Sequence, residues 1–155
     1  MIQHIKGEYA IQLGDGEAST RHIQLKDFKI RGHENANAGI FIHRATRLLI
    51  SNLRLSGYRH TDAGEFQEGS AAIKIYRSWI ITLRDCLLFD NYHGVYNHGK
   101  ELGTNAVHIS DCTIENNTYS GVYLHGVNRY SISCCTIETN NAGEYGIYVE
   151  TGRSI

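Results

Sequence analysis

A short pattern of apolar positions recurs five times along the chain. In each copy two apolar residues are separated by one residue, and after two further residues a second pair with the same spacing follows. In residues 81–88 the pairs are Ile81 with Leu83 and Cys86 with Leu88. The equivalent residues are Leu25, Ile50, Leu83, Ile109 and Ile132, separated by 25, 33, 26 and 23 residues. A period of two is typical of β-strands, and a repeat of this length is typical of a solenoid.

A second pattern, a small residue followed by an apolar-x-apolar segment, precedes each copy. It occupies residues 39–42, 72–75, 94–97, 121–124 and 146–149, and residues 9–13 form a degenerate earlier copy. The offset between the two patterns is eight residues in three repeats, from Ile42, Ile75 and Leu124. Strands this short bury no face alone, so we expect three strands per repeat that stack on their copies as parallel strands.

Stacking in this register predicts ladders of inward-facing side chains. Three ladders are Ile42, Ile75, Asn97 and Leu124; Leu25, Ile50, Leu83, Ile109 and Ile132; and Ile30, Leu55, Leu88, Ile114 and Ile137. A fourth, at a tight turn, is Phe28, Leu53, Cys86, Cys112 and Cys135. We therefore interpret three of the four cysteines as reduced core residues, since their spacing fits neither a zinc site nor a disulfide framework.

The runs Gly121-Val122-Tyr123-Leu124-His125 and Ser131-Ile132-Ser133-Cys134-Cys135-Thr136-Ile137 resemble the repeat of the pectate-lyase-like proteins. The resemblance covers about residues 9–150 and implies an all-β fold, a right-handed single-stranded parallel β-helix of about five to six coils. We expect one domain over residues 1–155, as a slice of a longer β-helix. The Asn that this family usually carries at the tight turn is replaced here, and a partial Asn column is expected at Asn91, Asn117 and Asn140.

Two columns of side chains are predicted to point outward from the first strand of each coil. The first column is Gln12, Phe41, Lys74, Tyr96, Tyr123 and Tyr148, and the second is Gly14, His43, Tyr76, His98, His125 and Glu150. Sugars stack their C–H faces on rings and pair their hydroxyls with imidazole, phenol and carboxylate groups. The face therefore suits a linear glycan, although β-propensity also favours aromatic residues on any exposed strand.

Two chemistries fit residues on or near this face. A glycosidase needs two carboxylates, for which Glu150 and the loop residues Asp62 and Glu65 are candidates, whereas a polysaccharide lyase needs a cation and a base. We predict catalytic roles for His98, His125, Glu150, Asp62 and Glu65. The predicted substrate-binding residues are Phe41, His43, Arg44, Lys74, Tyr76, Arg77, Tyr96, Tyr123 and Tyr148.

Two insertions and one pair of histidines complete the candidate site. Residues 57–70 and 99–105 are the long connections, and we expect them to wall one groove. His98 and His125 are neighbours that could share a cation, but no carboxylate is placed to complete the shell. No metal or other cofactor is therefore predicted.

Composition and charge limit the classes of partner that the chain is expected to bind. The 155 residues carry a net charge of −1, which argues against a general nucleic-acid binder. No apolar run is long enough to span a membrane, and the first residues lack the apolar segment of a signal peptide. The partner expected is a polysaccharide or cell-surface glycan, met by an extracellular or virion-associated protein.

Three hypotheses from different classes follow. The first is a polysaccharide lyase or glycoside hydrolase, as the resemblance to pectate-lyase-like enzymes and phage tailspikes implies. The second is a module that binds a glycan without cutting it. The third is a structural shaft, in which a homotrimer packs its aromatic columns against neighbouring chains.

Overall fold

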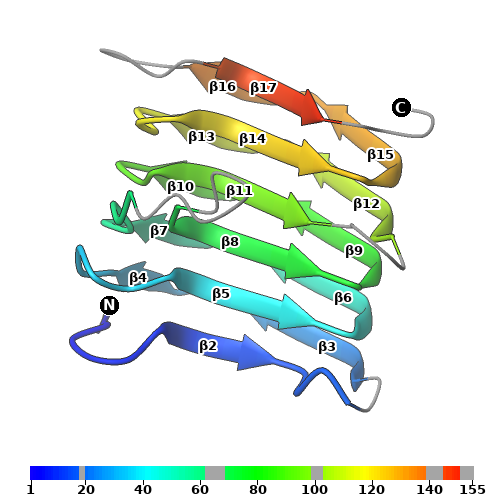
Figure 1. The fold of residues 1–155 in the computed structure, drawn as a ribbon, viewed down its shortest axis with the longest axis horizontal. Helices are drawn as coiled ribbons and strands as arrows, with labels where there is room; N and C mark the ends of the chain where they lie inside the picture. Colours follow the sequence, from blue (N-terminus) through cyan, green and yellow to red (C-terminus); the bar gives the residue numbers. More distant parts are fainter. Residues whose placement is uncertain (18–19, 62–68, 99–102, 139–144, 151–155) are drawn as a thin grey trace.

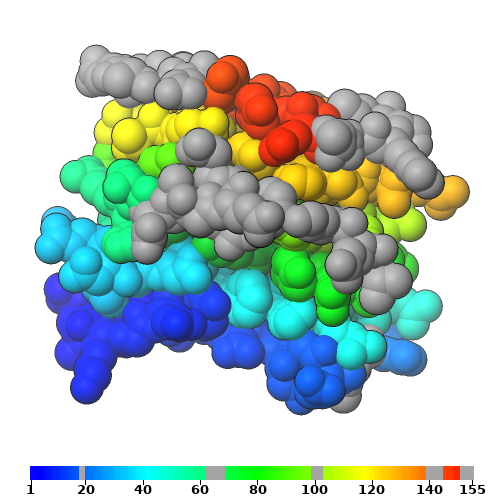
Figure 2. Space-filling view, viewed as in Figure 1, coloured from blue at the N-terminus to red at the C-terminus, as the bar shows by residue number. Residues whose placement is uncertain are grey.

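The protein folds as a solenoid of short parallel strands, as the computed structural model shows (Figure 1). The structure describes residues 1–17, 20–61, 69–98, 103–138 and 145–150. The chain visits three sheets in turn and makes five complete coils within these residues, preceded by one strand and followed by another. Each coil forms one layer of the molecule, seen as successive bands of colour in Figure 2.

Each sheet collects one strand from each coil. Sheet 1 contains β2 (Tyr9–Leu13), β5 (Ala38–His43), β8 (Ala71–Tyr76), β11 (His93–His98), β14 (Ser120–His125) and β17 (Tyr145–Glu150). Sheet 2 contains β3 (Thr20–Lys26), β6 (Ala45–Ser51), β9 (Trp79–Arg84), β12 (Asn105–Ser110) and β15 (Asn128–Ser133). Sheet 3 contains β1 (Ile2–Gln3), β4 (Lys29–Arg31), β7 (Arg54–Ser56), β10 (Leu87–Phe89), β13 (Thr113–Glu115) and β16 (Thr136–Glu138).

The strand register confirms the predicted ladders. In sheet 2 Leu25 pairs with Ile50, which pairs with Leu83, and the series continues through Ile109 to Ile132. The ladders of sheets 1 and 3 pair in the same way, from Ile42 through Leu124 and from Ile30 through Ile137. Apart from the buried polar Asn97, these side chains fill the interior of the coils as one apolar core, whose burial is the main source of stability.

A tight turn joins sheet 2 to sheet 3 in every coil. Its first position has a positive φ in all five coils, at Asp27, Asn52, Asp85, Asp111 and Cys134. Asp and Asn are the non-glycine residues that adopt this conformation most readily. The position after it belongs to the fourth predicted ladder, which contains three of the cysteines. Of these, Cys86 and Cys112 are buried and Cys135 is half-buried, and all are free thiols. The prediction of reduced core cysteines is confirmed.

The predicted Asn column is present at its two described members. The Asn91 side chain accepts a hydrogen bond from the Tyr58 amide (3.2 Å) and donates to the carbonyl of Leu55 (3.4 Å) and to Oδ1 of Asn117 (3.1 Å). The third member, Asn140, lies outside the described residues. The column satisfies buried backbone groups where the chain leaves sheet 3.

A second column of positive φ angles runs through sheet 2. It consists of His22, Arg47, Ile80, Ala106 and Arg129, with φ between 55° and 58°. In each coil this residue comes directly before an inward-facing apolar residue of sheet 2, such as Leu48, Val107 or Tyr130. Within the described part of the chain, no helix is long and apolar enough to cross a membrane.

Candidate functional site

The two outward columns of sheet 1 are in the predicted register. Phe41 pairs with Lys74, and the column continues through Tyr96 and Tyr123 to Tyr148. The last three rings are stacked, with centroids 5.1 Å and 4.9 Å apart. Parallel strands therefore turn residues that are 25–27 positions apart in the sequence into one continuous stack.

The second column is equally continuous. The rings of His43 and Tyr76 lie 5.0 Å apart, those of Tyr76 and His98 5.2 Å, and those of His98 and His125 4.9 Å. At its end, Nδ1 of His125 is 3.5 Å from a carboxylate oxygen of Glu150. The structure thus brings three predicted catalytic residues, His98, His125 and Glu150, into one row.

Much of this face is buried, contrary to the exposed strip expected from the sequence. Tyr96 and Tyr123 are only 3% and 1% exposed, and Lys74, His98 and His125 are buried as well. Ala71, Tyr96 and Tyr123 form a second apolar cluster on the outer side of the sheet, and Tyr119 and Tyr148 pack against it. Alternation along a strand fixes the side of the sheet but not what packs against that side.

His93, a residue that sequence reasoning missed, packs among the rings of this cluster. Its ring is fully buried and lies 5.2 Å from Tyr96 and 5.3 Å from each of Tyr119 and Tyr123. Its Nδ1 is 2.7 Å from Oγ of the buried Ser120, its register partner in β14. The position precedes the small residue of the repeat, so its column could have been found from the spacing.

An open cavity remains at one end of the face. It has a volume of about 240 Å³ and is lined by Tyr9, Asn37, Phe41, His43, Lys74, Ile75, Tyr76, Tyr96 and His98. Six of these are predicted site residues; Tyr9 and Asn37 are additions. Tyr9 stacks on Phe41 with centroids 4.5 Å apart, so both rings form one apolar wall.

Lys74 is the buried cation of this cavity. Its ammonium group donates a hydrogen bond to Oδ1 of Asn37 and lies 5.4 Å from the centroid of the Tyr96 ring. The Tyr96 hydroxyl is in turn 3.3 Å from Nδ1 of His98. Burial, followed by the charges of Arg77 and Arg44, lowers the pKa of His43, which keeps this imidazole neutral near pH 7.

Glu150 is held by its own column. The Tyr123 hydroxyl donates a 2.6 Å hydrogen bond to the same oxygen that faces His125. Burial and this bond raise the pKa of Tyr123, so the phenol keeps its proton. Glu150 is therefore an acceptor engaged by two neighbours, and it does not line the cavity.

The family comparison can now be set beside this geometry. Residues 7–155 match the profile of a family described as the right handed beta helix region. The chain belongs to this family. No curated protein and no solved structure matches it.

In this right-handed β-helix, the two predicted arginines lie beyond the strands of sheet 1. Arg44 and Arg77 occupy equivalent bends with positive φ; Arg44 donates to the carbonyl of Gly16 (2.9 Å), and the Arg77 guanidinium lies 5.3 Å from the Tyr76 ring. Neither lines the cavity. Arg77 reaches the cavity through the Tyr76 ring, and the charges of both arginines act on His43.

Part of the predicted site lies in segments that the structure does not describe. Asp62 and Glu65 lie outside the described residues, as do parts of the two insertions expected to wall a groove. The carboxylate pair of a glycosidase therefore stays a prediction. Among the described residues, no group of three or more His, Cys, Asp or Glu side chains is arranged to hold a metal ion.

Proposed function

We propose that the protein is a carbohydrate-active β-helix whose sheet 1 cavity binds a sugar unit of a polysaccharide. The observation that supports this most is the lining of the cavity, where the rings of Tyr9, Phe41 and Tyr76 surround the polar groups of Lys74 and His98. Rings stack on the C–H faces of sugars, while ammonium, amide and imidazole groups pair with their hydroxyls and carboxylates.

The size of the cavity sets the length of the bound segment. At about 240 Å³ it is below the roughly 300–1,000 Å³ of sites that enclose drug-sized ligands. It therefore suits one or two sugar units better than the long linear segment expected from the full columns. Binding of a chain end or a single branch sugar is the form of recognition that this volume favours.

Lys74 and His98 support cleavage by elimination. In a uronate polymer, Lys74 would pair with the carboxylate and His98 would take the proton from the adjacent carbon. The bond from the next carbon to the leaving sugar oxygen then breaks, a carbon–carbon double bond forms, and the leaving oxygen takes up a proton. The alternative is a module that binds a glycan without cutting it. This is favoured by Glu150, because its carboxylate is already engaged by Tyr123 and His125.

The test is the release of new reducing ends from a panel of neutral and acidic polysaccharides, with binding measured in parallel by calorimetry. Unsaturated ends, detected by ultraviolet absorbance, identify elimination, and saturated ends identify hydrolysis. Binding without new ends assigns the non-catalytic role. A panel that neither binds nor is cut contradicts the proposal.

Two variants locate the site. Phe41→Ala and Tyr76→Ala each remove a half-buried ring of the cavity and should weaken sugar binding by about two- to tenfold. Tyr145→Ala removes a ring from the same sheet that does not line the cavity, and should leave affinity unchanged. Equal losses in all three variants would contradict the location.

A further inference from the structure

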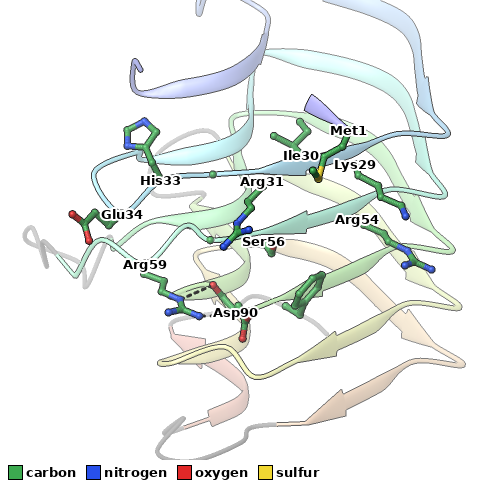
Figure 3. Close-up of a pocket in the computed structure, with 13 residues that line it drawn as sticks. Met1, Lys29, Ile30, Arg31, His33, Glu34, Arg54, Ser56, Arg59 and Asp90 are labelled. Carbon is green, nitrogen blue, oxygen red and sulfur yellow. Dashed lines mark hydrogen bonds and ion pairs between the residues drawn. The ribbon is translucent and has the colours of Figure 1, made fainter. Parts of the chain in front are cut away.

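A second and larger pocket lies on sheet 3. It has a volume of about 480 Å³, within the roughly 300–1,000 Å³ typical of ligand sites, and is built on β4, β7 and β10 (Figure 3). Among the residues that the structure describes, it shares no lining residue with the sheet 1 cavity. Within the described segments, its basic lining side chains are Lys29, Arg31, Arg54 and Arg59.

The strand register places two of these cations side by side. Lys29 of β4 pairs directly with Arg54 of β7, so the two chains leave adjacent parallel strands at equivalent positions. Strands in a sheet are about 4.8 Å apart, and like charges directly opposite each other on neighbouring strands are destabilising. Figure 3 shows both side chains extending at the same end of the pocket.

The carboxylates of the pocket do not neutralise this pair. The Asp90 carboxylate forms an ion pair with Arg59, with 3.5 Å between Oδ2 and Nη2. Arg59 Nε also donates a 3.2 Å hydrogen bond to the Asp90 carbonyl. In the described part of the chain, no carboxylate lies within ion-pair distance of Lys29, Arg31 or Arg54. Three positive charges therefore face the pocket, with Glu34 as the one other acidic lining residue among those described.

The rest of the lining suits a sugar more than an isolated ion. Arg31, Ser56 and Phe89 form one row across the three strands, so a cation, a hydroxyl and an aromatic ring stand next to one another. His33 lines the same pocket, and its Nε2 is buried without a hydrogen-bond partner. A ring for stacking, hydroxyl partners and fixed positive charges together match a sugar that carries carboxylate or sulfate groups.

We propose that this pocket is a second carbohydrate site, specific for an acidic glycan and separate from the sheet 1 cavity. Lys29, Arg31 and Arg54 bind the anionic groups, and Phe89 and Ser56 contact the sugar ring. That the ligand is a carbohydrate rests on the proposed function. The placement of the positive charges rests only on the strand register of sheet 3. Bound anions remove the repulsion between Lys29 and Arg54, so occupancy stabilises the fold.

The probes are oligogalacturonate, a heparin hexasaccharide and a neutral dextran oligosaccharide, each titrated into the full chain by calorimetry. The acidic probes should bind, with affinity falling as salt is raised, and the neutral one should not compete with them. Arg31→Gln and Arg54→Gln should each weaken acidic binding by about two- to fivefold, as expected for exposed charge pairs. The reversal Arg54→Glu should weaken it further.

The controls separate this site from the other and from general attraction. Arg21→Gln removes one exposed positive charge from sheet 2 and should keep the affinity of the unaltered protein. Tyr76→Ala tests the sheet 1 cavity and should not affect binding at sheet 3. Equal losses in Arg21→Gln and Arg54→Gln, loss in Tyr76→Ala instead, or no acidic binding at all would each overturn the proposal. Acidic binding that needs Arg31 and Arg54 supports it even if the sheet 1 cavity binds nothing.

Discussion

At the scale of single residues, backbone conformation sets a requirement that hydrophobicity does not reveal. Sheet 2 needs one positive φ in every coil, and the chain places His22, Arg47, Ile80, Ala106 and Arg129 there. For an L-residue this conformation costs about 1–2 kcal/mol, which glycine avoids. The cost is accepted five times because each such bend directs the following side chain into the core.

Arg129→Gly should therefore raise the free energy of unfolding by about 0.5–1 kcal/mol. Arg129 is exposed and has a φ of 55°, so little packing is lost, and the relief of strain exceeds the entropic cost of glycine. Ser131→Gly, two residues later in β15 at an exposed position with ordinary φ, should lower it by about 0.5–1 kcal/mol. Urea unfolding measures both, and the same sign in both variants would contradict the argument.

At the scale of elements, the buried amides of Asn91 and Asn117 connect adjacent coils where the chain leaves sheet 3. Each side-chain oxygen accepts a hydrogen bond from a backbone amide beyond the strands, that of Tyr58 for Asn91 and that of Asn91 for Asn117, and the two side chains also contact each other. This interaction is specific in direction, unlike the stacking of leucines and isoleucines beside it. It fixes the register of one coil on the next.

Asn91→Ala should lower the free energy of unfolding by about 1–3 kcal/mol. The substitution removes the hydrogen-bond partner of the Tyr58 amide and the bonds to the Leu55 carbonyl and to Asn117, and one buried unsatisfied group costs about 1–3 kcal/mol. Asn35→Ala, at an exposed turn position, should change it by less than about 0.5 kcal/mol. Denaturant unfolding with circular dichroism compares the two, and a small effect at Asn91 would show that the column is dispensable.

The elements also show how far the sequence alone could go. The ladder from Leu25 to Ile132 followed from spacing, because stacked coils must repeat their apolar positions. The columns from Phe41 to Tyr148 followed from alternation within each strand. The burial of Tyr123 did not, because alternation within a strand does not say what packs against its outer face; Tyr119, which packs against this cluster, lies between strands where no period applies. The basic pocket on sheet 3 was missed because alternation was followed outward only for the first strand of each coil, whereas Lys29, Arg31 and Arg54 flank the inward residues of the third strand.

At the scale of the whole molecule, buried imidazoles link stability to pH. His4 donates from Nε2 to the carbonyl of Lys6 (3.0 Å), and its Nδ1 lies 3.4 Å from the Tyr58 hydroxyl, an arrangement that suits the neutral ring. His33 packs edge-on against it, with centroids 4.8 Å apart. Burial, followed by the charge of His33, lowers the pKa of His4, as burial does for His43.

Stability should therefore fall as the pH drops below about 6.5, the pKa of an unperturbed histidine. Above that pH the imidazole is neutral in both states. Below it the unfolded chain binds the proton first, so unfolding is favoured until the pH reaches the lowered pKa of the folded state. Urea unfolding at pH 7.5 and 5.5 should show this loss, and His4→Gln should reduce it. The exposed His108, changed to Gln, should keep the slope of the unaltered protein.

The coil-on-coil register also shapes how the chain finds its structure. Pairing partners are neither close nor remote in sequence: Ala71 pairs with His93, 22 residues later, and Ile42 with Ile75, 33 residues later. Such non-local pairings form more slowly than the local contacts of helical proteins, because the entropy of loop closure is lost before each contact is made. Each coil needs only its neighbour as a template, so a nucleus of two coils can grow in either direction, one layer at a time.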